Sequence, residues 1–247
     1  MEKKIKNNNY LLPLLLLSLF FQFPLSDNTS HPHHFHKHFV FIHGSCHGAW
    51  SWFKLLPLLQ SSGHRVTALD LAASGIDHRN PDSIRSISQY FQPLTDFMSA
   101  LPQHQKVILV GHSLGGLAVA KAMEEFPTRI SAAVFVTATM PGPALNISTI
   151  YGKDLTLATL LMRPVPLFTE KDMSDVLKLS ERNYGSVKRV FVMSGMDLVS
   201  NKEFQRWMIE NNSPDRVVEM EGSDHMVMMS KPFQLCAHLQ LLAQYYP

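Results

Sequence analysis

A serine between two glycines is the residue of this sequence best placed to act as a nucleophile. Residues 111–115 read Gly-His-Ser-Leu-Gly, with Ser113 at the centre. The apolar residues 107–110 predict a buried strand before this motif, and the alanine-rich segment 117–125 predicts a helix after it. A serine on a sharp turn between a strand and a helix exposes its hydroxyl at the top of a sheet, and flanking glycines let other backbone approach that turn closely. Ser113 is therefore predicted to attack a substrate covalently.

A serine nucleophile needs a base, and the base needs a carboxylate that orients it. His225 follows the predicted strand 216–220, and Asp197 follows the predicted strand 187–194. The chain order Ser, Asp, His is the one that this strand–turn–helix architecture uses. Asp224 competes with Asp197 for the role, but adjacent residues of a loop rarely point the same way. Asp197 is therefore the predicted orienting acid and His225 the predicted base.

Attack on a carbonyl places negative charge on its oxygen, and two backbone N–H groups are predicted to stabilise that charge. Leu114 stands at the start of the helix, whose positive dipole end faces the same point. Ser45 lies in the loop after the first predicted strand, where Gly44 lets the backbone turn an N–H inward. We expect His43 to hold this loop by hydrogen bonds and His47 to line the pocket.

Strands and helices alternate along the chain. The predicted strands are 39–42, 66–71, 107–110, 130–140, 187–194 and 216–220, and the helices that separate the first of them are predicted near 49–59, 83–101 and 117–125. This alternation indicates an α/β fold whose mostly parallel sheet is covered by helices on both faces, with its ligand site at the carboxyl ends of the strands. Asp70 ends the second strand but precedes the nucleophile, so it is interpreted as a residue that fixes a loop.

The composition excludes several other classes of function. A chain of 247 residues with 45% hydrophobic residues can bury the core of one domain. The net charge of +2 is spread along the chain, so no nucleic-acid stripe is expected. The two cysteines, Cys46 and Cys236, are far apart and are expected to be buried apolar residues rather than a zinc site. The predicted chemistry needs no metal and no organic cofactor.

The first thirty residues differ from the rest of the chain. Lysines at positions 3, 4 and 6 precede a short apolar segment that a proline interrupts, which is typical of a secretory signal peptide or signal anchor rather than a stable membrane span. Residues 31–37 are interpreted as a histidine-rich linker and 38–247 as the catalytic domain. We expect entry into the secretory pathway or secretion; a cytoplasmic or plastid location and a homodimer are left open.

From about His38 to its end, the chain resembles the plant methylesterases of the α/β-hydrolase superfamily. Their close relatives include polyneuridine aldehyde esterase and the α-hydroxynitrile lyases. The resemblance is carried by 43–50 (His-Gly-Ser-Cys-His-Gly-Ala-Trp), 67–75, the serine motif, 184–189, 203–207 and 224–226. It implies a serine carboxylesterase that cleaves methyl salicylate, methyl jasmonate or methyl indole-3-acetate and releases methanol. The implied partner is therefore a small methyl ester.

Two positions separate esterases from lyases within this resemblance. The lyase relatives carry threonine where this chain has Gly44, and lysine where it has Met226. A lyase needs that lysine to stabilise departing cyanide. The resemblance therefore implies the esterase rather than the lyase.

The resembled family usually inserts a helical cap between the strand that ends at Met140 and the strand that starts at Val187, and here only residues 141–186 remain for it. A reduced cap weakens the enclosure of the acyl group more than it disturbs the catalytic residues. Met140, Leu160 and Phe168 are expected to line the remaining pocket together with Gly44, His47 and Met226. A protein that binds such ligands with little turnover is the alternative reading.

Overall fold

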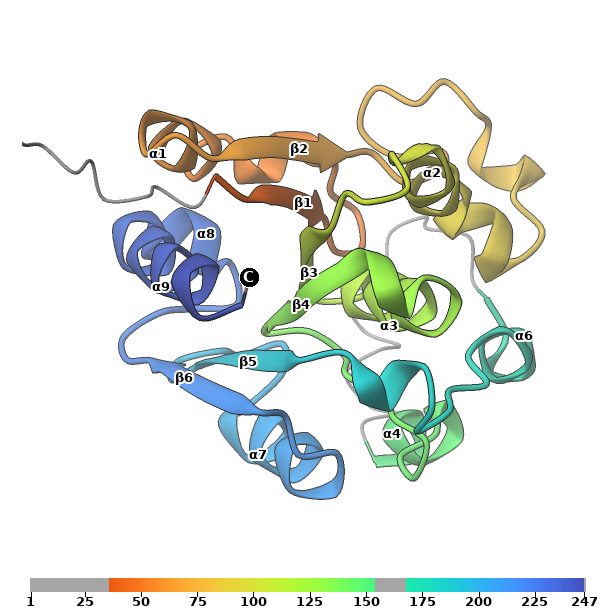
Figure 1. Ribbon diagram of the computed structural model, residues 1–247. Coiled ribbons are helices and arrows are strands. Elements are labelled where there is room, and N and C mark those ends of the chain that lie inside the picture. Colours follow the sequence, from red (N-terminus) through yellow and green to blue (C-terminus); the bar gives the residue numbers. More distant parts are fainter. Residues whose placement is uncertain (1–35, 154–167, 247) are drawn as a thin grey trace, which may run out of the picture. The chain divides into compact units, whose positions relative to one another are not determined.

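The computed structural model describes residues 36–153 and 168–246. The predicted leader 1–30 and Leu160 lie outside these ranges. Within them, six strands form one parallel sheet in the spatial order β2-β1-β3-β4-β5-β6 (Figure 1). The strands are β1 (His38–Ile42), β2 (Arg65–Leu69), β3 (Val107–His112), β4 (Ile130–Val136), β5 (Arg189–Ser194) and β6 (Arg216–Met220). This is the predicted α/β architecture.

Helices cover both faces of the sheet (Figure 1). One face packs against the 3₁₀ turn η1 (Ala49–Trp52), α1 (Leu56–Ser61), α8 (Val227–Ser230) and α9 (Pro232–Tyr245). The other packs against α2 (Ile87–Ala100), α3 (Gly115–Glu125), α4 (Ile147–Lys153), α6 (Glu170–Val176) and α7 (Lys202–Asn211). Shorter 3₁₀ turns are η2 (Pro81–Ser83), η3 (Pro127–Arg129) and η4 (Tyr184–Ser186).

The middle residues of β1 and β3 form continuous apolar runs because each face of these strands meets helices. On β1, Phe39 and Phe41 point into the core beneath α1 and α9, whereas Val40 and Ile42 point into the core beneath α2 and α3. Successive strand residues alternate between faces, so a strand buried on both sides reads as a continuous apolar run. This explains why the sequence marks β1 and β3 so clearly.

Three predicted elements have different boundaries in the structure. The strand predicted over 130–140 ends at Val136, because Thr137 has a φ of +45°, outside the range of a strand. The helix predicted over 49–59 is a 3₁₀ turn followed by the short α1. The helix predicted over 83–101 begins only at Ile87, where the Ser86 hydroxyl accepts the Gln89 N–H at 3.2 Å and caps the first turn.

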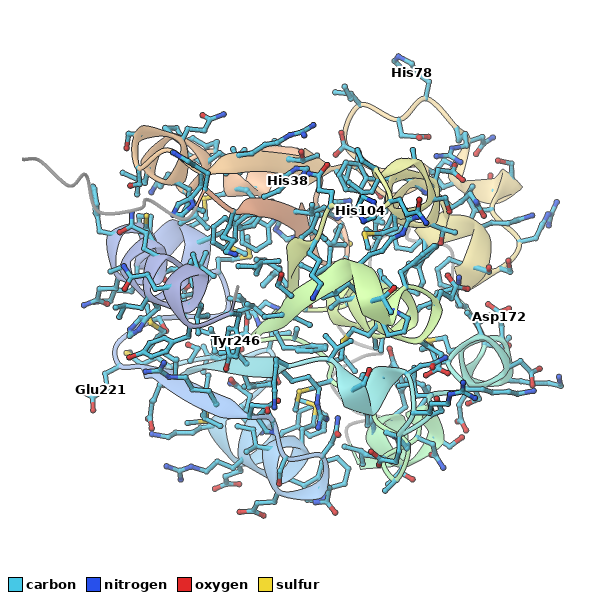
Figure 2. All side chains as sticks on the ribbon, viewed as in Figure 1. His38, His78, His104, Asp172, Glu221 and Tyr246 are labelled. Atoms are coloured by element: carbon cyan, nitrogen blue, oxygen red, sulfur yellow. The ribbon has the colours of Figure 1, made fainter. Side chains whose placement is uncertain are left out.

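The described parts of the predicted cap region are α4, α6 and η4. Asp172 on α6 (labelled in Figure 2) accepts the Ile87 N–H at the start of α2, with 2.7 Å between Oδ2 and nitrogen. Glu124 at the end of α3 accepts the backbone N–H groups of Ser180 at 2.8 Å and Tyr184 at 3.2 Å. These segments are therefore tied to the helices on the α2–α3 face of the sheet.

Two further observations concern cysteines and membranes. Neither Cys46 nor Cys236 takes part in a disulfide; Cys236 is buried, but Cys46 is exposed, so the expectation that both are buried is wrong for Cys46. Cys46 has a φ of +61° and is the exposed residue between half-buried neighbours in the loop after β1. Across 36–153 and 168–246, none of the helices has the length and apolar character needed to cross a membrane.

Candidate active site

Ser113 lies on the sharp turn between β3 and α3. Its φ of +52° falls in the left-handed region, which L residues rarely adopt and which is typical of strained functional positions. The backbone of the turn is nevertheless well anchored. The Ser113 N–H donates to Val136 O at 3.4 Å, and Ser113 O accepts the N–H groups of Gly116 at 3.0 Å and Thr139 at 3.1 Å. The continuation of β4 thus holds the nucleophile turn from both sides.

Two glycines let the turn lie directly against the end of β1. A Cβ on Gly115 would stand 2.5 Å from His43 O, and a Cβ on Gly44 would stand 2.7 Å from the Ser113 Cβ. Both separations are shorter than any ordinary contact. Only glycine at these positions allows the loop after β1 to reach the nucleophile.

His43 fixes the direction of the Gly44–Ser45 peptide. The Leu71 N–H donates to His43 Nε2 at 3.0 Å, so the ring carries its proton on Nδ1, which donates to Gly44 O at 2.7 Å. Burial lowers the pKa of His43 and keeps this neutral tautomer. In a planar trans peptide the N–H points opposite to the preceding carbonyl, so the Ser45 N–H points away from His43.

The two predicted oxyanion donors are both available. Among the residues that the structure describes, no acceptor is paired with the N–H of Ser45 or with that of Leu114. Leu114 immediately precedes α3, so its N–H belongs to the positive end of that helix. His47 donates from Nδ1 to Ser45 O at 2.6 Å, and Asp70 accepts the Ala49 N–H at 2.6 Å; both stabilise the loop after β1.

The candidate base and acid meet at the carboxyl ends of β5 and β6. His225 Nδ1 lies 2.8 Å from Asp197 Oδ2, and the Asp197 side chain is fully buried. The second carboxylate oxygen, Oδ1, accepts the N–H groups of Val199 and Ser200, each at 2.8 Å. Asp224 instead accepts the Met226 N–H at 3.0 Å. Because Nδ1 donates to Asp197, His225 presents the lone pair of Nε2 for proton transfer.

A buried set of polar side chains connects the loops that carry Asp197 and His225. Ser194 Oγ donates to Ser223 O at 2.6 Å, and the two hydroxyls lie 2.9 Å apart. Gln205 on α7 accepts the Ser194 N–H at 3.0 Å and donates to Ser200 O at 2.5 Å, bridging the two ends of the Asp197 loop. Nothing in the sequence marks these three residues, because a serine or glutamine near a strand end carries no distinguishing pattern.

His225 is also held through its backbone. His112 Nε2 donates to His225 O at 3.0 Å, and Thr137 Oγ1 lies 2.9 Å from the same oxygen. His112 was visible as the variable residue before Ser113 in the motif, but nothing in the sequence marked Thr137.

The other residues expected to bind substrate are placed as follows. Met140 is fully buried in the core beneath α2 and α3, and the Phe168 ring packs against the Tyr90 ring with 5.5 Å between centroids. Met226 is half-buried at the start of α8. The His47 ring lies 6.2 Å from the His112 ring. Of this set, Gly44 makes the closest approach to Ser113.

This arrangement suits acyl transfer. It offers the hydroxyl of Ser113 on the turn between β3 and α3, an imidazole oriented by a buried carboxylate, and two N–H donors near the nucleophile. In the described part of the chain, no group of three His, Cys, Asp or Glu side chains is placed to hold a metal ion.

Comparisons with known proteins agree with this description. Residues 37–161 match the family model described as the alpha/beta hydrolase fold. Methyl jasmonate esterase 1 of Vitis vinifera is 43% identical over 255 residues, covering 85% of this chain and 98% of the relative. Salicylic acid-binding protein 2 of Nicotiana tabacum is 40% identical over 256 residues, covering 85% of this chain and 98% of the relative.

A solved structure gives the same result. The crystal structure of polyneuridine aldehyde esterase superimposes with a TM-score of 0.74 and 36% sequence identity, covering 84% of this chain and 99% of that one. Each alignment therefore extends over almost the whole length of the relative.

The alignment with the grape relative also contains positions that this chain lacks. An alignment over 255 residues that includes 85% of 247 residues, about 210, leaves about 45 positions of the grape relative without a counterpart. That these positions belong to the cap between β4 and β5 stays a prediction.

Proposed function

The chain belongs to the plant methylesterases of the α/β-hydrolase family and is a carboxylic ester hydrolase; from this we propose that Ser113, His225 and Asp197 are its catalytic triad. Its substrates are proposed to be methyl esters of small plant hormones: methyl salicylate, methyl jasmonate or methyl indole-3-acetate. The single observation that best supports the triad is the 2.8 Å contact of His225 Nδ1 with Asp197, whose other oxygen is already occupied by two backbone N–H groups.

In the proposed mechanism, Ser113 Oγ attacks the ester carbonyl while His225 Nε2 accepts the hydroxyl proton. Asp197 stabilises the imidazolium that forms, and the N–H groups of Ser45 and Leu114 stabilise the oxyanion. His225 then gives its proton to the leaving oxygen, so methanol departs and an acyl-serine is left. A water, deprotonated by His225, attacks this acyl-enzyme, and the free acid is released with the Ser113 hydroxyl restored.

The hormone esters are proposed from the relatives. One relative is named a methyl jasmonate esterase and another a salicylic acid-binding protein. The leaving group is the same for all these esters, whereas the acyl group differs in size and polarity. The residues that would distinguish the acyl groups are proposed to be Gly44, His47, Met140, Leu160, Phe168 and Met226.

Methanol release from a panel of esters tests the proposal. The full chain is given methyl salicylate, methyl jasmonate, methyl indole-3-acetate and a short p-nitrophenyl ester, and Ser113→Ala is assayed alongside. We expect turnover of at least one methyl ester and a loss of about 10⁴-fold or more in kcat in the serine variant, whose melting temperature should be unchanged.

Two results would contradict the proposal in different ways. Turnover that survives Ser113→Ala would exclude Ser113 as the nucleophile. A folded protein that binds the free acids in calorimetry but cleaves no ester, including the activated one, would identify a ligand-binding member of the fold, the reading that a shortened cap favours.

A further inference from the structure

The backbone carbonyl of His225 receives hydrogen bonds from two side chains that no catalytic role yet explains. Thr137 Oγ1 lies 2.9 Å from this oxygen and His112 Nε2 lies 3.0 Å from it. Thr137 follows β4 and His112 ends β3, whereas His225 follows β6. Residues at or just after the ends of β3, β4 and β6 therefore come together at this carbonyl.

Thr137 adopts a backbone conformation that a threonine rarely accepts. Its φ is +45°, and for a β-branched residue the left-handed region is a genuine outlier. The side chain is 1% exposed, and the Thr137 N–H donates to Val192 O at 2.9 Å, so the conformation is held on both sides. Strain that the surrounding structure maintains in this way is characteristic of functional positions.

The same segment holds the nucleophile. Val136 O accepts the Ser113 N–H, and Thr139 N–H donates to Ser113 O. Thr137 stands between these two residues, and its single hydroxyl proton is shared between Val136 O at 2.8 Å and His225 O at 2.9 Å. A hydroxyl that only closed the end of β4 would contact Val136 O alone, whereas this hydroxyl also contacts the loop after β6. Residues 136–139 therefore join the backbone of the nucleophile to the backbone of the base.

His112 is the second donor to the His225 carbonyl. It is 1% exposed, and its Nδ1 has no hydrogen-bond partner among the described residues. Since a carbonyl only accepts, the ring must carry its proton on Nε2. Burial, with the neighbouring His225 as a second cause, lowers the pKa of His112 well below its ordinary value. A neutral His112 adds no positive charge beside His225, whose ring centroid is 4.7 Å away.

We propose that Thr137 is a positioning residue for the base: together with His112 it holds the His225 carbonyl and so fixes the backbone of His225 relative to Ser113. This inference rests on the proposed triad. Asp197 fixes the imidazole ring through Nδ1, but a ring held only at one nitrogen can still move with its loop. The two donors to the carbonyl remove that freedom. A displacement of about 1 Å between reacting groups costs on the order of 10²-fold in rate.

Paired substitutions at Thr137 test the role of its hydroxyl. Thr137→Val removes the hydroxyl but keeps the size and the β-branch, so backbone strain is matched; Thr137→Ser keeps the hydroxyl. We expect Thr137→Val to lower kcat about 10- to 100-fold with KM within about twofold, and Thr137→Ser to keep kcat within about threefold of the unaltered chain.

Thr67→Val is the matched control. Thr67 Oγ1 lies 2.8 Å from His38 Nε2 on neighbouring strands, so this substitution also breaks a threonine–histidine hydrogen bond. His38 begins β1, at the end of the sheet opposite the candidate active site. Thr67→Val should lower the melting temperature by an amount comparable to Thr137→Val and leave kcat unchanged.

Three kinetic outcomes would overturn the proposal. They are an unchanged kcat in Thr137→Val, an equal loss of kcat in Thr137→Ser, and an equal loss of kcat in Thr67→Val. The first would show that the hydroxyl does not act, the second that only packing matters, and the third that any loss of stability lowers the rate.

Proton NMR provides a readout that does not need turnover. The His225 Nδ1 proton, held by Asp197, should give a far-downfield resonance in the unaltered chain and in Thr137→Ser. In Thr137→Val it should exchange with water several-fold faster, because the base loop opens more often. If the unaltered chain cleaves no ester, the proposed function fails, but this comparison still decides whether Thr137 holds His225. Equal exchange in all three proteins would overturn the inference.

Discussion

Gly44 lies where the loop after β1 contacts the turn that carries Ser113. A Cβ there would lie 2.7 Å from the Ser113 Cβ and 2.8 Å from His112 Nδ1, so one of the two backbones would have to move. The Gly44–Ser45 peptide carries the Ser45 N–H, and its direction depends on the His43 contact with Gly44 O. On the proposed mechanism, a substitution at Gly44 is therefore expected to weaken charge stabilisation more than binding of the ester.

Gly44→Ala is accordingly expected to lower kcat about 10²- to 10³-fold, the usual effect of losing one oxyanion donor, and to change KM little. Steady-state kinetics on the best methyl ester measures this. Gly185→Ala is the control, because a Cβ at this η4 residue meets mainly the flexible end of the Glu181 side chain. A large rise in KM with unchanged kcat in Gly44→Ala would mean that Gly44 shapes the binding site and not the oxyanion hole.

At the scale of single residues, the sequence predicts those residues that belong to a recognisable motif or follow a fixed chain order. The glycine pattern pointed to Ser113, and the chain order of acid and base pointed to Asp197 and His225, which follow β5 and β6 in the structure. Thr137 could not be found in this way, because its function depends on a φ angle and on a neighbour 88 positions away. A threonine after an apolar run looks like one more strand residue.

The loop after β5 is the element on which the acid depends. It leaves the sheet at Ser194 and continues through Ser200 into α7, where the fully buried Gln205 bonds both Ser194 and Ser200. Ser194 also bonds Ser223, so the loop is coupled to the one that carries His225. Asp197 is therefore held by the hydrogen bonds that Gln205 and Ser223 make with its loop, as well as by its own hydrogen bonds.

Gln205→Leu should therefore affect both stability and catalysis. It leaves the Ser194 N–H and Ser200 O buried without partners, which costs about 1–3 kcal/mol of unfolding free energy for each group. Urea denaturation measures this loss, and kcat of the folded variant should fall about 10-fold as the acid loop loosens. In Gln240→Leu, where the amide bonds Ser62 between α9 and α1, stability should fall without any loss of kcat. Full activity in folded Gln205→Leu would show that Asp197 needs no support from α7.

At the scale of helices and strands, apolar runs in the sequence predicted the order of the strands. They did not predict the residues at which strands and helices begin and end. The strand predicted to reach residue 140 stops at Val136, since Thr137 turns out of the sheet in order to bracket the nucleophile turn. The helix predicted from residue 49 divides into η1 and α1, with a proline in the first turn of α1. Both differences arise from contacts with distant segments, which local patterns do not record.

For the molecule as a whole, buried histidines make stability depend on pH. Burial lowers the pKa of His38 to about 4 and lowers the pKa of His43 and of His112 as well. In the unfolded chain these side chains titrate near 6.5. Below about pH 6.5 the unfolded state therefore binds protons that the folded state does not, and the free energy of unfolding falls as the pH falls.

Urea denaturation at pH 7.5, 6.5, 5.5 and 4.5 should show this dependence. The free energy of unfolding should be nearly constant above pH 6.5 and should decrease steadily below it. In His38→Gln the free energy of unfolding should decrease less steeply with falling pH, because an amide cannot titrate. The slope should be smaller by the equivalent of up to one bound proton. The exposed His104 provides the control His104→Gln, which should leave the slope unchanged. Identical slopes in all three proteins would show that His38 does not remain neutral on folding.

The order in which the site's residues occur along the chain has a consequence for biosynthesis. The loop after β1 and the Ser113 turn are made first, Asp197 comes later, and His225 follows β6, the last strand of the sheet. On the proposed triad, the nucleophile and both oxyanion donors are therefore synthesised long before the base that activates the serine. A nascent chain that ends before His225 is then expected to hydrolyse no ester. Activity measured in a cell extract would on this proposal count only molecules that extend past residue 225, however well the sheet of a shorter product has formed.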